Sequence, residues 1–272
     1  MPMQLQLVPA RRGVLWVRQG FSTFFARPLS FMGLFGVLLM AMLVAQLLPW
    51  IGPLLFWASL PLVTLGFMLG TQQALQGKYP TPQVFIAPMR GPHARALWKL
   101  GALYALAMFV VAGVYTLIDD GRSEALQIAA TSGKATPESV AALLSDARLQ
   151  LGFLWFAGAA AVMSLPFWHA PALVYWGGQS VGKAMFFSTV ACWRNKWAFA
   201  VYGLTGFAAI LLFAVVSSLL FALFGQPNMA ALAMMPAVLM FTAVFYTSLF
   251  FTFADCFEMP PETPVLAKES NP

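Results

Sequence analysis

Four stretches of the chain contain no charged residue, and each is rich in apolar side chains: residues 28–77, 100–118, 149–182 and 197–254. A helix rises 1.5 Å per residue and the hydrocarbon core of a bilayer is about 30 Å thick, so one crossing needs about 20 apolar residues. Turn signals rich in Pro and Gly, at 49–53 and 225–228, divide the first and last stretches in two. The pattern predicts six membrane-spanning helices, near 29–49, 53–73, 100–118, 150–176, 198–223 and 231–254.

These spans predict an all-α fold, an integral membrane helical bundle with interfacial amphipathic helices. Transmembrane barrels are excluded because their strands alternate over about ten residues, whereas these stretches are uniformly apolar. We divide the chain into a segment 1–28, a six-helix membrane domain 29–256 and a tail 257–272. Residues 119–149 form the one sizeable loop on the far side, and Thr136-Pro137-Glu138 within it is typical of a helix start.

Basic residues are distributed unevenly between the two sides that six crossings define. Only three of the 15 Lys and Arg residues, Arg122, Lys134 and Arg148, lie in the loop 119–149. The others lie in the two termini or in the loops on the same side as the termini. Since cytoplasmic loops of inner-membrane proteins are enriched in Lys and Arg, we expect both termini in the cytoplasm and the loop 119–149 outside.

The segment 1–28 has the periodicity of an amphipathic helix. Val14, Val17, Phe21 and Phe24 recur at helical spacing, with arginines among the other positions. We expect this segment to lie in the cytoplasmic interface, although Gly13 and Gly20 lower its helix propensity. The segment 180–193 shows a similar but less regular pattern before the fifth span.

Short motifs recur before and within the spans. A cluster of Trp and basic residues precedes each odd-numbered span: Trp16 with Arg18, Trp98 with Lys99, and Trp193 with Arg194, Lys196 and Trp197. Ser-Leu-Pro occurs in the second and fourth spans, at 59–61 and 164–166. The recurrence indicates three helical hairpins that enter the membrane from the same side, through duplication or through shared constraints of the bilayer.

Composition agrees with a membrane protein and excludes several other classes. The chain of 272 residues is 60% hydrophobic and only 9% charged, whereas soluble domains carry about 25% charged residues. Such hydrophobicity excludes intrinsic disorder, and the two cysteines, Cys192 and Cys256, are too few for a disulfide scaffold. We attribute the net charge of +6 to membrane topology and expect no nucleic-acid partner, since no recognition motif is present.

The clusters of Trp and basic residues are candidate contacts for anionic lipid headgroups. The candidates are Arg11, Arg12, Arg18, Trp193, Arg194 and Lys196. The alternative is an ordinary aromatic and cationic belt at the membrane interface.

His169 is the candidate polar site inside the membrane, because it lies in the fourth span between Pro166 and Pro171. A proton relay would need an acid or base on another span, and no Asp or Glu lies deep in any span. The alternative is a hydrogen-bonded packing histidine. Asp255, at the end of the sixth span, is a candidate partner of Arg194 or Lys196, and the alternative is an ordinary charge at the membrane interface.

No catalytic, cofactor-binding or metal-binding motif is found, so we expect neither an enzyme nor a cofactor. The leading hypothesis is a non-enzymatic membrane component that binds lipid or a partner. Its expected partners are membrane lipids, a second copy of the chain, or another membrane protein. A small-molecule transporter with a cavity near His169 and a membrane subunit of an enzyme complex are the alternatives.

Two segments resemble a family of uncharacterised proteobacterial polytopic inner-membrane proteins. They are residues 170–195, which include Phe187-Ser188-Thr189-Val190-Ala191-Cys192-Trp193-Arg194-Asn195, and the opening that includes Val8-Pro9-Ala10-Arg11 and Trp16-Val17-Arg18-Gln19-Gly20-Phe21. The resemblance covers nearly the whole chain and implies an inner-membrane location but no site. More distantly, the hairpin pattern looks like the membrane domains attached to some phosphodiesterases, whose catalytic portion is absent here.

The orientation is testable with reporter fusions. We predict that a green fluorescent protein fused after residue 272 fluoresces and that alkaline phosphatase at the same position is inactive, because both termini are cytoplasmic. The same reporters inserted in the loop 119–149 should give the opposite pattern. An active phosphatase at the carboxyl end would contradict an even number of crossings with the termini inside.

Overall fold

The computed structural model describes residues 4–49, 51–131, 136–226 and 229–257. Six of its helical segments are long and apolar enough to cross a membrane, which confirms the predicted number. They are α2 (Pro28–Gln46), α3 (Ile51–Leu75), α5 (Ala94–Asp119), α8 (Ala147–Phe167) continued by α9 (Ala170–Tyr175), α11 (Lys196–Leu223) and α12 (Met229–Cys256). Residues 258–272 of the predicted tail lie outside the described residues.

A short helix precedes each odd-numbered span: α1 (Arg12–Ala26), α4 (Gln83–Arg90) and α10 (Val181–Arg194). The three hairpins α2/α3, α5/α8 and α11/α12 therefore share one plan, a short helix followed by two long ones. The Ser-Leu-Pro motifs also agree locally, because Ser59 Oγ donates to Phe56 O (2.8 Å) and Ser164 Oγ donates to Ala161 O (2.6 Å). In both helices the serine lies two residues before the proline, and its hydroxyl donates to a backbone carbonyl one turn earlier in the helix.

The loop 119–149 is helical for much of its described length. Helix α7 (Pro137–Leu144) begins where the sequence predicts it, and Thr136 Oγ1 accepts a hydrogen bond from Ser139 N–H (3.3 Å). Helix α6 (Arg122–Thr131) was not predicted. Hydrogen bonds from the backbone N–H groups of Leu149 and then Arg148 hold the pKa of Asp146 below its ordinary value, at the start of α8.

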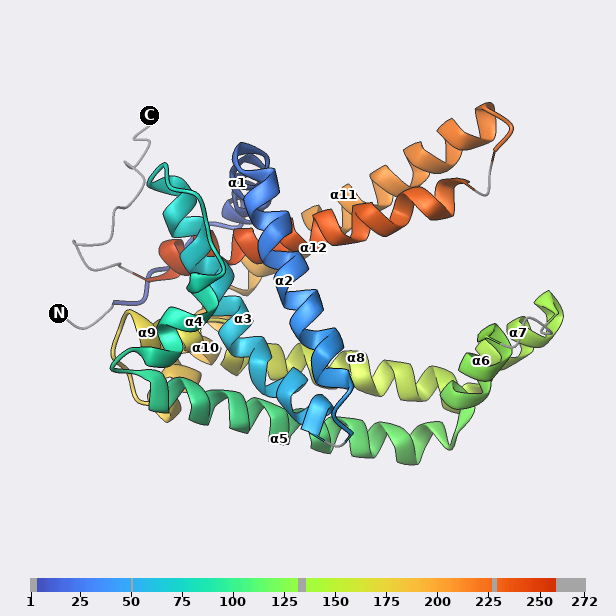
Figure 1. The fold of residues 1–272 in the computed structure, drawn as a ribbon, viewed down its shortest axis with the longest axis horizontal. Coiled ribbons are helices and arrows are strands. Elements are labelled where there is room, and N and C mark those ends of the chain that lie inside the picture. The colour runs from blue at the N-terminus through green and yellow to red at the C-terminus, as the bar shows by residue number, and fades with distance from the viewer. Residues whose placement is uncertain (1–3, 50, 132–135, 227–228, 258–272) are drawn as a thin grey trace.

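The hairpins converge at one end of the molecule and diverge toward the other (Figure 1). The short helices α1, α4, α9 and α10 lie at the converging end, which we call the short-helix end. The α11/α12 and α5/α8 hairpins point away from it in different directions, and α6 and α7 extend the latter. The main buried cluster includes residues of α1, α3, α5, α9, α11 and α12, so the hydrophobic core lies toward the short-helix end.

Helix α1 packs along α11 and α12, with Trp16 completely buried. Two glycines permit the close approach. A Cβ atom on Gly13 would lie 2.3 Å from Ala198 O, and one on Gly20 would lie 2.7 Å from Ser248 Cβ. The helix is therefore amphipathic as predicted, but Val17 and Phe24 of the face expected to meet the bilayer are buried within the protein, and only Val14 is well exposed. The glycines that weaken its helix propensity are its points of contact.

A substitution at Gly13 tests this packing. Gly13→Ala should lower the stability of the detergent-solubilised protein by about 1–3 kcal/mol, as overpacking does in tight cores, because the new methyl group meets the backbone of α11. Gly33→Ala in α2 is the matched control, since nothing lies within 4 Å of its added Cβ atom. Thermal unfolding followed by circular dichroism would measure both. Equal melting temperatures for Gly13→Ala and the wild type would contradict the packing of α1.

Candidate functional site

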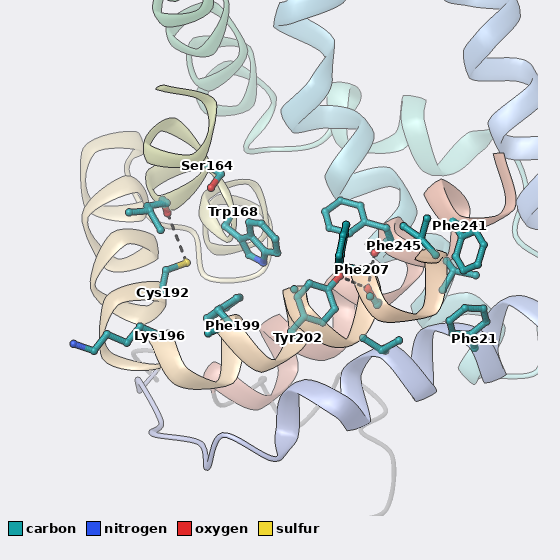
Figure 2. A pocket seen from close by; sticks show the side chains of 18 of the residues that line it. Phe21, Ser164, Trp168, Cys192, Lys196, Phe199, Tyr202, Phe207, Phe241 and Phe245 are labelled. Atoms are coloured by element: carbon teal, nitrogen blue, oxygen red, sulfur yellow. Dashed lines mark hydrogen bonds between the residues drawn. The ribbon is translucent and has the colours of Figure 1, made fainter. Parts of the chain in front are cut away.

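A cavity of about 670 Å³ lies between α8, α10, α11 and α12, and Val17 and Phe21 of α1 also line it (Figure 2). Its size is within the roughly 300–1,000 Å³ of small-molecule sites. We call it the α8–α11 groove. Helix α11 supplies one continuous wall, which consists of Lys196, Phe199, Ala200, Tyr202, Gly203, Gly206, Phe207 and Ile210. The facing residues are mainly aromatic and aliphatic, with Trp168, which directly follows α8, and Phe245 on α12 among them.

The groove follows one face of α11 for several turns. From Lys196 to Ile210 the helix rises roughly 21 Å at 1.5 Å per residue, whereas one leaflet contributes about 15 Å of hydrocarbon. Gly203 and Gly206 leave open space on this face, because nothing lies within 4 Å of a Cβ atom added at either position. The groove is therefore as deep as one leaflet and a headgroup layer. Gly203 and Gly206 make it wider because they have no side chain on this face.

Four polar side chains in the groove have hydrogen-bond partners within the protein. The Tyr202 hydroxyl lies 2.6 Å from Ser248 Oγ, and Trp168 Nε1 donates to Thr252 Oγ1 (3.2 Å). Ser164, which also lines the groove, bonds to its own helix. Because these groups are satisfied within the protein, the inner surface of the groove suits an apolar chain better than a polar solute.

Lys196 is the charged residue among the described residues that line the groove, and it lies where α11 begins. Its Nζ atom is 5.2 Å from the ring centroid of Trp193 and 5.8 Å from that of Trp197. Both indoles are exposed, by 65% and 70% respectively. The arrangement places a cation between two amphipathic rings at one end of an apolar groove. Three of the predicted headgroup residues, Trp193, Arg194 and Lys196, thus lie together beside it.

The groove wall at the end of α8 includes a break in the helix, and Ser188 bridges this break. After Pro166 the regular helical hydrogen bonding is interrupted at residues 168–169, between α8 and α9, although both residues keep right-handed helical φ and ψ angles. Ser188 Oγ, from α10, accepts a hydrogen bond from His169 N–H (3.0 Å) and donates one to Leu165 O (2.7 Å). One hydroxyl thus satisfies both backbone groups freed by the break. The sequence does carry a signal at this residue, since Phe187-Ser188-Thr189 in α10 matches Phe21-Ser22-Thr23 in α1, but it does not indicate the role of the hydroxyl.

His169 lies behind the groove and not in its lining. Its side chain is fully buried, and its ring centroid is 5.9 Å from that of Phe199, 5.8 Å from Phe253 and 5.5 Å from Phe257. Neither ring nitrogen has a hydrogen-bond partner within the described part of the chain. Phe199, which contacts the His169 ring, lines the groove, and so does Trp168, the residue before His169 in the sequence. His169 itself does not line it.

The three predicted N-terminal arginines have different surroundings. Arg11 and Arg18 are exposed, whereas the guanidinium of Arg12 makes two hydrogen bonds to the carboxylate of Asp255, at 2.6 and 2.5 Å. The prediction that Asp255 pairs with Arg194 or Lys196 was therefore wrong. It failed because the packing of α1 against α12, which brings Arg12 to the end of α12, was not foreseen.

Cys192 lines the groove but is poorly suited to act as a nucleophile. Burial raises the pKa of its thiol to about 12, so the reactive thiolate is scarce at neutral pH. Its Sγ atom lies 3.9 Å from Leu165 O, and both cysteines are free. No group of three or more His, Cys, Asp or Glu residues suited to a metal ion occurs among the described residues.

Comparison with known proteins gives one curated relative of the whole chain. A "probable inner membrane protein" of Burkholderia thailandensis is 34% identical over 273 aligned positions, which cover 99% of this chain and 100% of the relative. No protein-family model matches the chain, and no solved structure matches it. The relative supports the resemblance to proteobacterial inner-membrane proteins that residues 170–195 and the N-terminal segment indicate.

The bridge at Ser188 can be tested by removing its hydroxyl. Ser188→Ala should lower stability by about 1–3 kcal/mol, since it removes the acceptor of the buried His169 N–H group and leaves Leu165 O with only the weak Cys192 thiol as a donor. Ser22→Ala is the control, because Ser22 occupies the same position of the related motif Phe21-Ser22-Thr23 and is exposed. Chemical denaturation in detergent would compare them. If the two variants lose equal stability, Ser188 does not hold the break together.

Proposed function

The chain belongs to the family of the Burkholderia thailandensis inner-membrane protein, and we propose that it is a non-enzymatic membrane component that binds a lipid. The observation that carries the proposal is the α8–α11 groove, which joins an apolar surface as deep as one leaflet to a single lysine at its end. An acyl chain fills such a groove, and an anionic headgroup neutralises the lysine.

The acyl-chain part of the proposal is supported by the composition of the lining. An acyl chain has no hydrogen-bonding group, and the polar side chains along the wall of the groove, Ser164, Trp168, Tyr202 and Ser248, have their partners in the protein. A chain already in the bilayer gains little from exchanging one apolar environment for another. Its retention therefore depends on van der Waals contact with the groove walls and on the headgroup.

The headgroup part is supported by Lys196 and the indoles beside it. An ammonium group binds a lipid phosphate as a point charge, and exposed Trp rings are stable at the level of the headgroups. Arg194, Arg11 and Arg18 are exposed and add positive potential at the short-helix end, worth about 1 kcal/mol per basic residue near an anionic surface. With the termini in the cytoplasm, as the basic residues predict, the bound lipid comes from the cytoplasmic leaflet.

Neither alternative function has a comparable observation in its favour. A transporter that uses His169 needs this residue to face a cavity, whereas Phe199 separates it from the groove. An enzyme needs a base beside a nucleophile, and the residues that line the groove include Ser164 and Cys192 but no His, Asp or Glu. The residues that line the groove therefore suit the binding of a lipid better than catalysis.

Native mass spectrometry tests the proposal. The wild-type protein, purified in a mild detergent and incubated with phosphatidylglycerol, should retain about one lipid molecule, and Gly203→Leu should lose it because the new side chain fills the groove. Gly158→Leu on α8 is the matched control, since Gly158 is also exposed and open but does not line the groove. Lys196→Gln should reduce the preference for phosphatidylglycerol over phosphatidylethanolamine several-fold.

The opposite results are equally clear. Equal lipid retention by the Gly203→Leu and Gly158→Leu variants would show that the groove is not the binding site. No retained lipid in the wild type, under conditions in which the protein stays folded, would contradict the proposed function itself.

A further inference from the structure

We propose that Asp255 is a positioning residue for the lipid site: it fixes Trp16, and Trp16 supports the aromatic wall of the α8–α11 groove. This inference rests on the proposed lipid-binding function. Asp255 is on α12 at the short-helix end and does not line the groove itself. Its effect on a bound lipid would therefore be indirect.

The carboxylate of Asp255 binds two side chains of α1 at once. Arg12 donates from Nε to Oδ2 (2.6 Å) and from Nη2 to Oδ1 (2.5 Å), which is the two-pronged geometry that Arg and carboxylate groups favour. Trp16 Nε1 donates to the same Oδ2 atom (2.6 Å). Arg12 and Trp16 are one helical turn apart, so they reach the carboxylate from the same face of α1.

Trp16 is the link between this contact and the groove. Its side chain is completely buried, and its ring centroid is 5.2 Å from that of Phe199 and 5.9 Å from that of Tyr202. Both of these residues line the groove. The indole therefore lies directly behind two aromatic residues of the groove wall, with its N–H group held by Asp255.

The supported rings in turn meet the opposite wall. Phe199 is 5.5 Å from Trp168, and Tyr202 is 6.3 Å from Trp168 and 6.3 Å from Phe245, between ring centroids. A rotation of Trp16 would remove the support of Phe199 and Tyr202 and change the width of the groove between α8 and α11. The path from Asp255 to the lipid site is thus a series of direct contacts.

Asp255 is the residue that determines the orientation of Trp16. A buried indole N–H group without an acceptor is costly, so the ring adopts the orientation in which Asp255 accepts its hydrogen bond. Arg12 fixes the carboxylate in turn. The Asp255 side chain is only 19% exposed and the Arg12 side chain 32% exposed, so solvent competes weakly for the carboxylate. The same contact also keeps in place α1, whose Val17 and Phe21 line the groove.

A double-mutant cycle on the full-length protein separates positioning from general stability. The readout is the affinity for phosphatidylglycerol, measured by native mass spectrometry at several lipid concentrations. Asp255→Ala and Trp16→Phe should each weaken binding roughly three- to tenfold, which corresponds to a part of the free energy of a hydrogen bond to a charged group, because their effect on the lipid is indirect. The double variant should bind no more weakly than the weaker single variant, because both changes remove the same support.

Asp120→Ala is the control for loss of an ion pair as such. Asp120 pairs with Arg122 (2.8 Å) and with Arg148, in the loop at the other end of the spans. Its substitution should leave phosphatidylglycerol binding unchanged. Asp255→Glu keeps the carboxylate and should retain most of the affinity. If Asp255→Ala does not yield folded protein, Trp16→Phe and Asp255→Glu decide the matter: the first must weaken binding and the second must not.

The outcomes distinguish this inference from the proposed function. If the wild type retains no phosphatidylglycerol, the proposed function fails and the inference fails with it. If the wild type binds and Gly203→Leu does not, but Trp16→Phe and Asp255→Ala bind as the wild type does, only the inference is wrong. Multiplicative losses in the double variant would also overturn it, since they would show that Asp255 and Trp16 act independently.

Discussion

The contact of α1 with α11 and α12 is the interaction on which the rest of the structure depends. A bilayer offers no hydrophobic driving force between helices, so they associate through close packing and polar contacts. Here Gly13 and Gly20 let the backbones approach, and Asp255 binds Arg12 and Trp16 at the end of the interface. The same contact places Trp16 behind the groove wall, so the feature that joins the chain's first helix to its last also shapes the proposed lipid site.

The divergence of the hairpins gives the groove its opening. The α5/α8 and α11/α12 hairpins meet near the short-helix end and separate beyond it (Figure 1). Leu204, Phe207 and Leu211 on α11 are more than half exposed, as expected of side chains that face acyl chains. Under the proposed function, lipid fills the space between the diverging hairpins, and the α8–α11 groove is the place where the protein retains one lipid molecule longer than the surrounding bilayer lipids do.

The six spans could be predicted from the sequence because the bilayer requires each span to have a certain length and to be apolar, and both properties can be read from one sequence. The sequence also predicted α7 from its Thr-Pro-Glu start and the proximity of Trp193 to Lys196. It did not predict contacts between helices. Helix propensity alone makes Gly13 and Gly20 unfavourable in a helix, and it does not show that they are contact points. Several basic residues lie on the same side of the membrane as Asp255, so the sequence does not identify its partner. Nothing in the sequence indicates that Ser188 bridges residues 165 and 169. Those features depend on which faces meet, and hydrophobicity that is uniform around a span does not specify a face.

The most direct test of the account is a single-particle cryo-electron microscopy structure of the full chain in nanodiscs that contain phosphatidylglycerol. The account predicts an elongated density in the α8–α11 groove, along α11 from Lys196 toward Ile210, with its head beside Lys196 and with Trp16 bonded to Asp255. A groove closed by direct contact between α8 and α11, or α1 lying in the membrane interface away from α12, would contradict it.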